Sequence, residues 1–250
     1  MEHPFTWHAV LPYPLSLLPE HTFMALVVML LLMLLVFAAR LAMARSQDPI
    51  VPEAGLSIRN LLEVLVELVV GLSDGIIGRK GRKYVPLFGS FFLFILVANL
   101  LGLVPGFSPP TSNLNTTLGL ALVSFAAYNF FGFYEHGLGY IKQFIGPMTT
   151  IPSTRRKILT LLFIPLLILS VAFFFILEAF SHAFRPVSLS LRLFGNMFGD
   201  HEVLSAFIDL TKVLVPVLFY ALGALVSVVQ AFVFTILSVI YVALAISHEH

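Results

Sequence analysis

One arginine stands in the most apolar half of a very apolar chain. Arg192 lies in the run from Arg185 to Phe198, and no acid lies within seven residues of it on either side. A guanidinium does not lose its proton inside a protein, and placing one at mid-membrane costs about 2.5–3.5 kcal/mol on insertion scales. A chain that keeps Arg192 there needs a permanent positive charge, which suits the handling of ions rather than the making of bonds.

Other polar residues accompany Arg192 at helical spacing. If the segment 178–200 is helical, at about 100° per residue, the polar side chains fall within about 120° of one another. They are Glu178, Ser181, His182, Arg185, Ser188, Arg192 and Asn196. Such a stripe on an apolar membrane helix must face protein or water rather than lipid. We expect Pro186 to bend this helix, and the small residues Gly195 and Gly199 to allow a neighbouring helix to approach.

Three consecutive titratable residues follow the stripe: Asp200, His201 and Glu202. Carboxyl and imidazole groups titrate within reach of physiological pH once their surroundings shift them. The group is therefore a candidate proton relay, and the alternative is a solvated loop at a helix break.

Simpler interpretations stay open for the other charged residues of this segment. Arg185 and Arg192 could extend to the membrane surface, where a charged end remains hydrated. His182 could be a structural histidine. Glu178 could be an ion-pair partner of His182 or Arg185 rather than part of an ion path.

Two amide side chains lie in otherwise apolar tracts. Gln230 is in the last tract and Asn99 in an earlier one, and such residues most often hydrogen-bond another helix. The sequence contains no cysteine and no nucleotide-binding loop, Ser/His/Asp elbow or HExxH zinc motif. We therefore expect no metal, no cofactor, no nucleic-acid partner and no catalysis by the chain alone.

The composition predicts an all-α polytopic membrane protein. Hydrophobic residues make up 59% of the chain and charged residues only 11%, with a mean hydropathy of +0.99, whereas a soluble domain is about 25% charged. Because a span takes about 20 apolar residues, we expect a single membrane domain, 1–250. Its elements are a first upright span at 22–39, an amphipathic helix at 60–77, a hairpin of spans at 85–104 and 114–133, and long helices at 158–209 and 213–246.

The orientation of two of these elements differs from that of an upright span. The segment 60–77 suits a helix lying along the membrane surface, although a soluble helix packed on the rest fits the same pattern. The tract 213–246 is too long for one upright span, so it is tilted or bent.

The distribution of Lys and Arg predicts the orientation. Residues 40–83 carry seven and residues 135–157 carry four of the 14, whereas segments 1–39 and 84–134 carry none. By the positive-inside rule the two basic regions are cytoplasmic. The N-terminus and the loop near Pro109 are then outside, in a multi-pass protein of the plasma (inner) membrane.

The run Pro186-Val-Ser-Leu-Ser-Leu-Arg-Leu-Phe-Gly-Asn-Met197 closely resembles the signature of subunit a of the rotary F-type ATP synthase, in its bacterial form. Further matches agree in order and spacing: Asn99-Leu-Leu-Gly-Leu-Val-Pro105, Leu114-Asn-Thr-Thr117 and Gln230-Ala-Phe-Val-Phe234 ahead of Tyr241. The resemblance covers nearly the whole chain, from the first span to the end.

The resemblance implies a stationary channel that carries protons through two half-channels to and from the carboxylates of a rotating c-subunit ring, which drives ATP synthesis. It also implies b-type peripheral stalk subunits, the F1 sector indirectly, and surrounding membrane lipid as partners. Arg192 matches the family's essential arginine, Asn196 the asparagine beside it and Gln230 the glutamine on the last helix. Three residues match polar positions associated with the half-channels: Asn99, Ser188 and Glu178. The last two long helices are expected to lie strongly tilted and to face the ring.

Two positions depart from the family pattern. The position nine after the arginine is often Glu, and here it is His201, with Glu202 next to it. The position seven before the glutamine is commonly His or Glu, and here it is Gly223. We place the outer relay on Asp200, His201 and Glu202.

Two other classes of function stay open on the residues alone. The first is a self-contained secondary transporter in which Arg192 binds an anionic substrate, although no internal repeat of the kind common in such transporters is present. The second is a membrane scaffold in which Arg192 is only structural.

Overall fold

The structure, a computed structural model, describes residue 13 and residues 17–45, 57–140, 157–210 and 214–247. These residues form helices and connecting turns without a strand, which confirms the all-α prediction. The elements are α1 (Glu20–Arg45), α2 (Ile58–Ile76), η3 (Arg79–Tyr84), α3 (Val85–Leu101), η4 (Pro110–Ser112), α4 (Leu114–His136), η5 (Gly137–Gly139), α6 (Lys157–Leu210) and α7 (Leu214–Ile246).

Four segments of the described chain are long and apolar enough to cross a membrane: Glu20–Ala44, Arg79–Leu101, Leu114–His136 and Val215–Ile246. The chain is therefore a multi-pass membrane protein, as its composition predicts. Three of the basic residues used for the orientation, Lys142, Arg155 and Arg156, lie outside the described residues.

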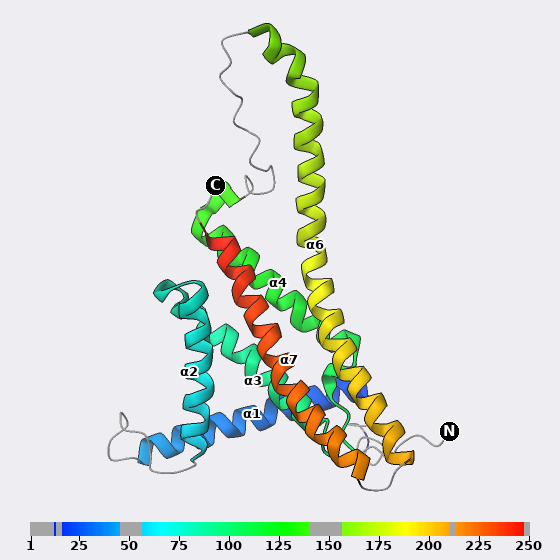
Figure 1. Ribbon diagram of the computed structural model, residues 1–250. Helices are drawn as coiled ribbons and strands as arrows, with labels where there is room; N and C mark the ends of the chain where they lie inside the picture. The colour runs from blue at the N-terminus through cyan, green and yellow to red at the C-terminus, as the bar shows by residue number, and fades with distance from the viewer. Residues whose placement is uncertain (1–12, 14–16, 46–56, 141–156, 211–213, 248–250) are drawn as a thin grey trace.

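The first two helices run across each other (Figure 1). Helix α2 begins at Ser57, whose side chain accepts a hydrogen bond of 3.2 Å from the backbone N–H of Arg59. Helix α2 therefore takes a direction different from that of the first span.

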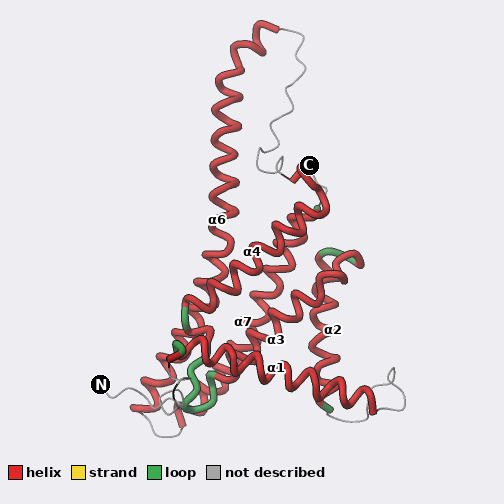
Figure 2. Tube along the Cα trace, turned by 180° about the vertical axis from the view of Figure 1, so that it is seen from behind, coloured by secondary structure: helices red, strands yellow, loops and turns green. Residues whose placement is uncertain are grey.

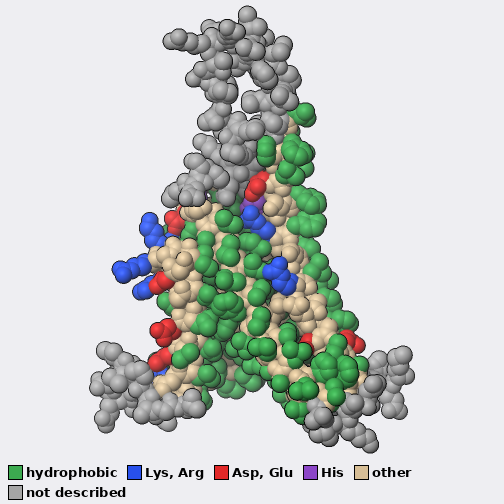
Figure 3. All heavy atoms as spheres, viewed as in Figure 1, with side chains coloured by type: hydrophobic (Ala, Val, Ile, Leu, Met, Phe, Trp, Pro, Cys, Tyr) green, Lys and Arg blue, Asp and Glu red, His purple; other side chains and the backbone are tan. Residues whose placement is uncertain are grey.

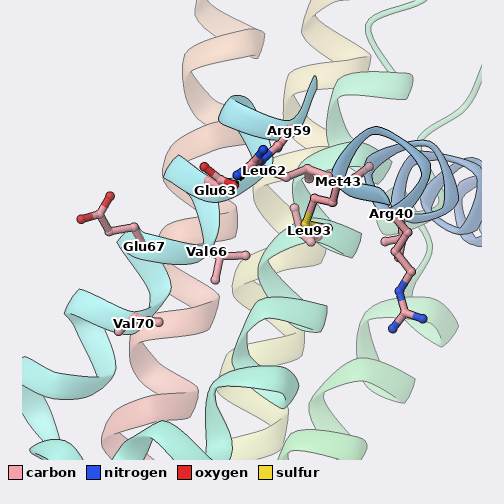
Figure 4. Close-up of a pocket in the computed structure, with 11 residues that line it drawn as sticks. Arg40, Met43, Arg59, Leu62, Glu63, Val66, Glu67, Val70 and Leu93 are labelled. Carbon is pink, nitrogen blue, oxygen red and sulfur yellow. Dashed lines mark hydrogen bonds and ion pairs between the residues drawn. The ribbon is translucent and has the colours of Figure 1, made fainter. Parts of the chain in front are cut away.

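An apolar cavity of about 580 Å³ lies between α1, α2 and α3 (Figure 4). Its walls include Leu62, Val66 and Leu93. At its edge the guanidinium of Arg59, which is only 2% exposed, is paired at 2.7 Å with Glu63 one turn later. The ion pair compensates the buried charge of Arg59. The cavity leaves an apolar surface open between α1 and α2.

Ion pairs hold the turn that leads from α2 into the second span. Gly78 adopts φ 83°, a conformation that side chains disfavour, and the chain then reverses so that Arg82 pairs with Asp74 at 2.6 Å. The hydrogen bond from Arg82 holds the pKa of the Asp74 carboxyl below its ordinary value. Lys83 pairs with Glu135, which joins the start of α3 to the end of α4.

The predicted hairpin of spans is a hairpin in chain order, but its two arms pack against other helices: α3 mainly against α7, and α4 against both α6 and α7. Phe91 of α3 meets Phe234 of α7 edge to face, with ring centroids 5.5 Å apart. On the other side, Ser124 of α4 donates a hydrogen bond of 3.0 Å to Ser238 of α7. Helix α7 is thereby fixed between both arms by aromatic packing and by a buried polar contact of the kind that joins membrane helices.

The long helix α6 extends beyond the rest of the fold (Figures 1 and 2). Its 54 residues run without interruption through Pro165 and Pro186, and in Figure 1 the ribbon changes direction in its yellow part. At about 1.5 Å per residue it is about 80 Å long, far more than a hydrocarbon core of about 30 Å. In Figure 1, the directions of α6 and α7 make a large angle with the direction of α1.

Candidate functional site

The polar residues of α6 divide into an exposed and a buried group. Ser188, Arg192 and Asn196 are exposed, as residues four apart on one helical face should be. His182 is only 4% exposed and lies against α4. Figure 3 shows positively charged side chains on the surface over α6, surrounded by apolar ones. The stripe is therefore not uniform: His182 points into the protein interior, whereas Ser188, Arg192 and Asn196 lie on the outer face of α6.

Arg192 has no acidic partner within the described part of the chain. The ion pairs found there join other residues, and Arg192 makes no hydrogen bond to a described residue. The exposed guanidinium is free to meet a charge outside the chain.

Asn196 and Gln230 are brought together from α6 and α7. The side-chain amide of Asn196 donates a hydrogen bond of 2.7 Å to the Oε1 atom of Gln230. Gln230 is only 3% exposed, so this bond satisfies a buried polar group. It also fixes the register of the two helices one turn after Arg192.

A cavity of about 490 Å³ opens between α6 and α7 beside this bond. On the α6 side it is lined by Gly195, Asn196, Gly199 and Asp200. A Cβ atom added at Gly195 or Gly199 would meet nothing within 4 Å. No described helix of this chain fills the space that these glycines leave, so they help to open a hollow along the two turns of α6 that follow Arg192.

Asp200 faces α7 at Gly223, the second of the two positions that depart from the pattern of subunit a. A Cβ atom at Gly223 would lie 2.7 Å from Oδ2 of Asp200. The carboxyl group thus occupies the space that a side chain at position 223 would need.

The three residues 200–202 do not form one cluster. They are helical, because α6 continues to Leu210, so the alternative of a loop at a helix break is wrong. Successive helical side chains point about 100° apart. Asp200 lines the cavity, whereas His201 and Glu202 do not, and Glu202 is exposed.

Asn99 lies inside α3 and is 2% exposed. Its Oδ1 atom accepts a hydrogen bond of 2.6 Å from the hydroxyl of Thr111. Its Nδ2 atom is buried without a hydrogen-bond partner among the described residues. One turn later, Leu103 packs beside Gly223, which places α3 behind the Asp200 side of the cavity.

The start of the stripe forms a buried contact chain. Oε1 of Glu178 lies 3.1 Å from Nε2 of His182, and Nδ1 of His182 lies 3.1 Å from the hydroxyl oxygen of Tyr128 on α4. Of the two ion-pair partners considered for Glu178, it is His182 that lies within ion-pair distance.

Sequence reasoning missed Tyr128, and it missed the bond of 3.0 Å between the hydroxyls of Thr117 and Ser190. A phenol or hydroxyl in an apolar span carries no signal by itself. Only the position of α4 against α6 shows which of these groups matter.

Within the described residues, no group of three or more His, Cys, Asp or Glu side chains could hold a metal ion. The family model for the ATP synthase A chain matches residues 22–243, which includes α6 and nearly all of α7. The chain belongs to this family. The resemblance to subunit a of the F-type ATP synthase is thereby confirmed.

Individual members of the ATP synthase A chain family are similar over most of their length. ATP synthase subunit a of Bdellovibrio bacteriovorus is 44% identical over 214 residues, which cover 85% of each chain. ATP synthase subunit a 1 of Syntrophotalea carbinolica is 39% identical over 88% of this chain and 84% of its own. ATP synthase subunit a of a Sulfurihydrogenibium species is 36% identical over 90% of this chain and 98% of its own.

Proposed function

We propose that this chain is the stationary proton channel in the membrane sector of a rotary ATP synthase. It carries protons through two half-channels to and from carboxylates on a ring of c subunits, and the resulting rotation drives ATP synthesis. The chain is not catalytic alone. Membership of the ATP synthase A chain family supports this role.

The observation that carries the proposal is the exposed guanidinium of Arg192, which has no acidic partner among the described residues. A ring carboxylate must be neutral in lipid, because a bare charge buried there is costly. Beside a fixed positive charge the ionised form is favoured. Arg192 would supply that charge, next to the cavity between α6 and α7.

The two half-channels would approach Arg192 from opposite ends of α6. Glu178 and His182 precede Arg192 on the side that the positive-inside rule makes cytoplasmic, so we assign them to the inner half-channel. Asp200 follows Arg192 and lines the cavity, so we assign it to the outer one. Arg192 between them repels a proton that would cross directly.

Four other candidates have lesser parts in the path. Ser188 is exposed one turn before Arg192, and the buried Asn99 is joined to Thr111, so both fit polar walls of the path. His201 and Glu202 could serve only at the mouth of the outer half-channel, because neither lines the cavity.

The partners and location follow from the same role. We expect contacts with the c-subunit ring, with b-type peripheral stalk subunits, with membrane lipid and, indirectly, with the F1 sector. We expect a location in the plasma (inner) membrane with the N-terminus outside.

The decisive experiment replaces Arg192 by Ala in the complete complex. Proton-driven ATP synthesis in vesicles should be lost while the complex still assembles, because the ring carboxylate loses its counter-charge. Near-normal synthesis would refute the proposal. Proton flux in liposomes with and without the c-ring separates this function from a self-contained transporter, which would conduct alone, and from a scaffold, which would not conduct in either case.

A further inference from the structure

The contact chain at the start of the α6 stripe joins the surface of the protein to its interior. The side chain of Glu178 is 37% exposed and that of His182 only 5%, and Tyr128 is 1% exposed. Carboxyl, imidazole and phenol groups thus follow one another from the outer face of α6 to the buried face of α4. The imidazole between them contacts a group on each of its two nitrogens.

The two contacts of the imidazole suit one of its two tautomers. A neutral imidazole has one N–H and one acceptor nitrogen, and the atom that the second nitrogen contacts selects the tautomer. When the Tyr128 hydroxyl donates to Nδ1, the proton of the neutral ring must lie on Nε2. That nitrogen faces Oε1 of Glu178 at 3.1 Å.

A proton on Nε2 suits both states of the carboxyl group. A carboxylate accepts at both oxygens, and a protonated carboxyl still has an oxygen that accepts. One oxygen of Glu178 can therefore stay with His182 while the other takes up and releases a proton. The separation of 3.1 Å keeps Oε1 within hydrogen-bond distance of Nε2.

Tyr128 is itself held from two sides. The guanidinium of Arg185 lies over the Tyr128 ring at 5.7 Å and over the Tyr241 ring of α7 at 5.4 Å. Such cation–π contacts stabilise a cation between aromatic faces. Phe125 meets the Tyr128 ring edge to face at 5.2 Å. The groups that surround His182 are thus Glu178 and Arg185 from its own helix, Tyr128 from α4 and, across Arg185, Tyr241 from α7.

We propose that Tyr128 and His182 are positioning residues that hold the Glu178 carboxyl group in the inner half-channel, in both of its protonation states. This inference rests on the proposed function, because it takes Glu178 as a proton-carrying group. It adds that Glu178 depends on a hydroxyl of another helix.

The test measures passive proton flux through the membrane sector, in vesicles that contain the whole complex stripped of F1. Tyr128→Phe removes only the hydroxyl, so Nδ1 loses its donor and the tautomer is no longer fixed. The matched control is Tyr84→Phe, since Tyr84 is also buried, at 3%, and its hydroxyl donates to Glu135 at 3.3 Å, away from Glu178, His182 and Tyr128. Both changes are made alone and together with Glu178→Gln, and the amount of assembled complex is measured in each.

Tyr128→Phe should lower the flux about fivefold, the factor expected for one hydrogen bond of ordinary strength. Tyr84→Phe should change it less than about twofold. With Glu178→Gln already present, Tyr128→Phe should have almost no further effect, because a residue that acts only through another loses its influence when that residue is replaced. His182→Ala should behave as Tyr128→Phe does.

Two results would overturn the inference. The first is unchanged flux in Tyr128→Phe. The second is an equal loss with and without Glu178→Gln, which would make Tyr128 a merely structural residue. Either result together with lost synthesis in Arg192→Ala would leave the proposed function standing, whereas retained synthesis in Arg192→Ala would remove the proposed function itself.

Discussion

Asp200 of α6 and Gly223 of α7 fit together as a side chain and the space left for it. A Cβ atom at position 223 would lie 2.7 Å from the Asp200 carboxyl and 2.8 Å from Leu103. Real Cβ contacts are essentially never that short. Where subunit a commonly carries His or Glu on the last helix, this chain has Gly223, and the carboxyl group of Asp200 from the facing helix fills the space of that side chain.

Gly223→Ala should lower proton-driven ATP synthesis by several-fold without preventing assembly. The added methyl group meets the ends of two side chains rather than backbone, so Asp200 can move aside but no longer keeps its position in the cavity. Gly119→Ala on α4 is the matched control, because a Cβ there meets nothing within 4 Å. Equal rates for the two variants would show that the position of Asp200 does not matter.

The Asn196–Gln230 bond should appear as a coupling between two substitutions. Each of Asn196→Ala and Gln230→Ala should slow synthesis, and the double variant should be little worse than the poorer single variant, because both remove one bond. The expected coupling is about 1 kcal/mol, or about a fivefold discrepancy from the product of the single effects. Gln230→Glu keeps the accepting oxygen and should preserve more activity than Gln230→Ala. Independent, multiplying effects would mean that the bond is not used.

The elements could be predicted from the sequence because long apolar tracts and basic loops are local signals. The packing of α7 against both α3 and α4 could not be predicted, because these helices carry apolar residues on every face. The order of apolar residues in the sequence then does not distinguish one neighbouring helix from another. The predicted helix 158–209 includes residues 200–202, which the structure bears out, although three polar residues in succession are as typical of a loop as of a helix exposed on several sides.

A residue of the candidate site could be predicted from the sequence where its charge is costly to place in the membrane or where it belongs to a long sequence motif. Arg192 meets both conditions, and the helical spacing places Ser188 and Asn196 on its face. The partnership of Asp200 with Gly223, and of His182 with Tyr128, depends on how α6 lies against α7 and α4. No spacing within one segment contains that information.

The Asp74–Arg82 ion pair predicts a pH dependence at the turn between α2 and η3. The hydrogen bond from Arg82 lowers the pKa of Asp74 from its ordinary value of 3.8. A carboxyl group whose pKa is lowered in the folded state stabilises the fold at any pH above its pKa in the unfolded state. That contribution is lost as the pH falls through its pKa in the folded state. Wild type should therefore exceed Asp74→Asn in thermal stability by a small, constant amount between pH 6 and pH 8, because the pair is largely exposed. Only below about pH 4 should the two converge, and convergence near neutral pH would contradict the assignment.

Arg192→Lys should fail although it keeps a positive charge. The guanidinium presents a planar fork that can hold a carboxylate through two parallel hydrogen bonds, whereas an ammonium is a compact charge that can also lose its proton in an apolar place. Synthesis in vesicles should fall more than about tenfold, which corresponds to about 1.4 kcal/mol. Arg40→Lys is the control, because Arg40 is an exposed arginine beside the α1–α2 cavity and should tolerate the exchange. If Arg192→Lys worked within about twofold of wild type, charge alone would suffice at this position, and the geometry of the fork would have no part in coupling.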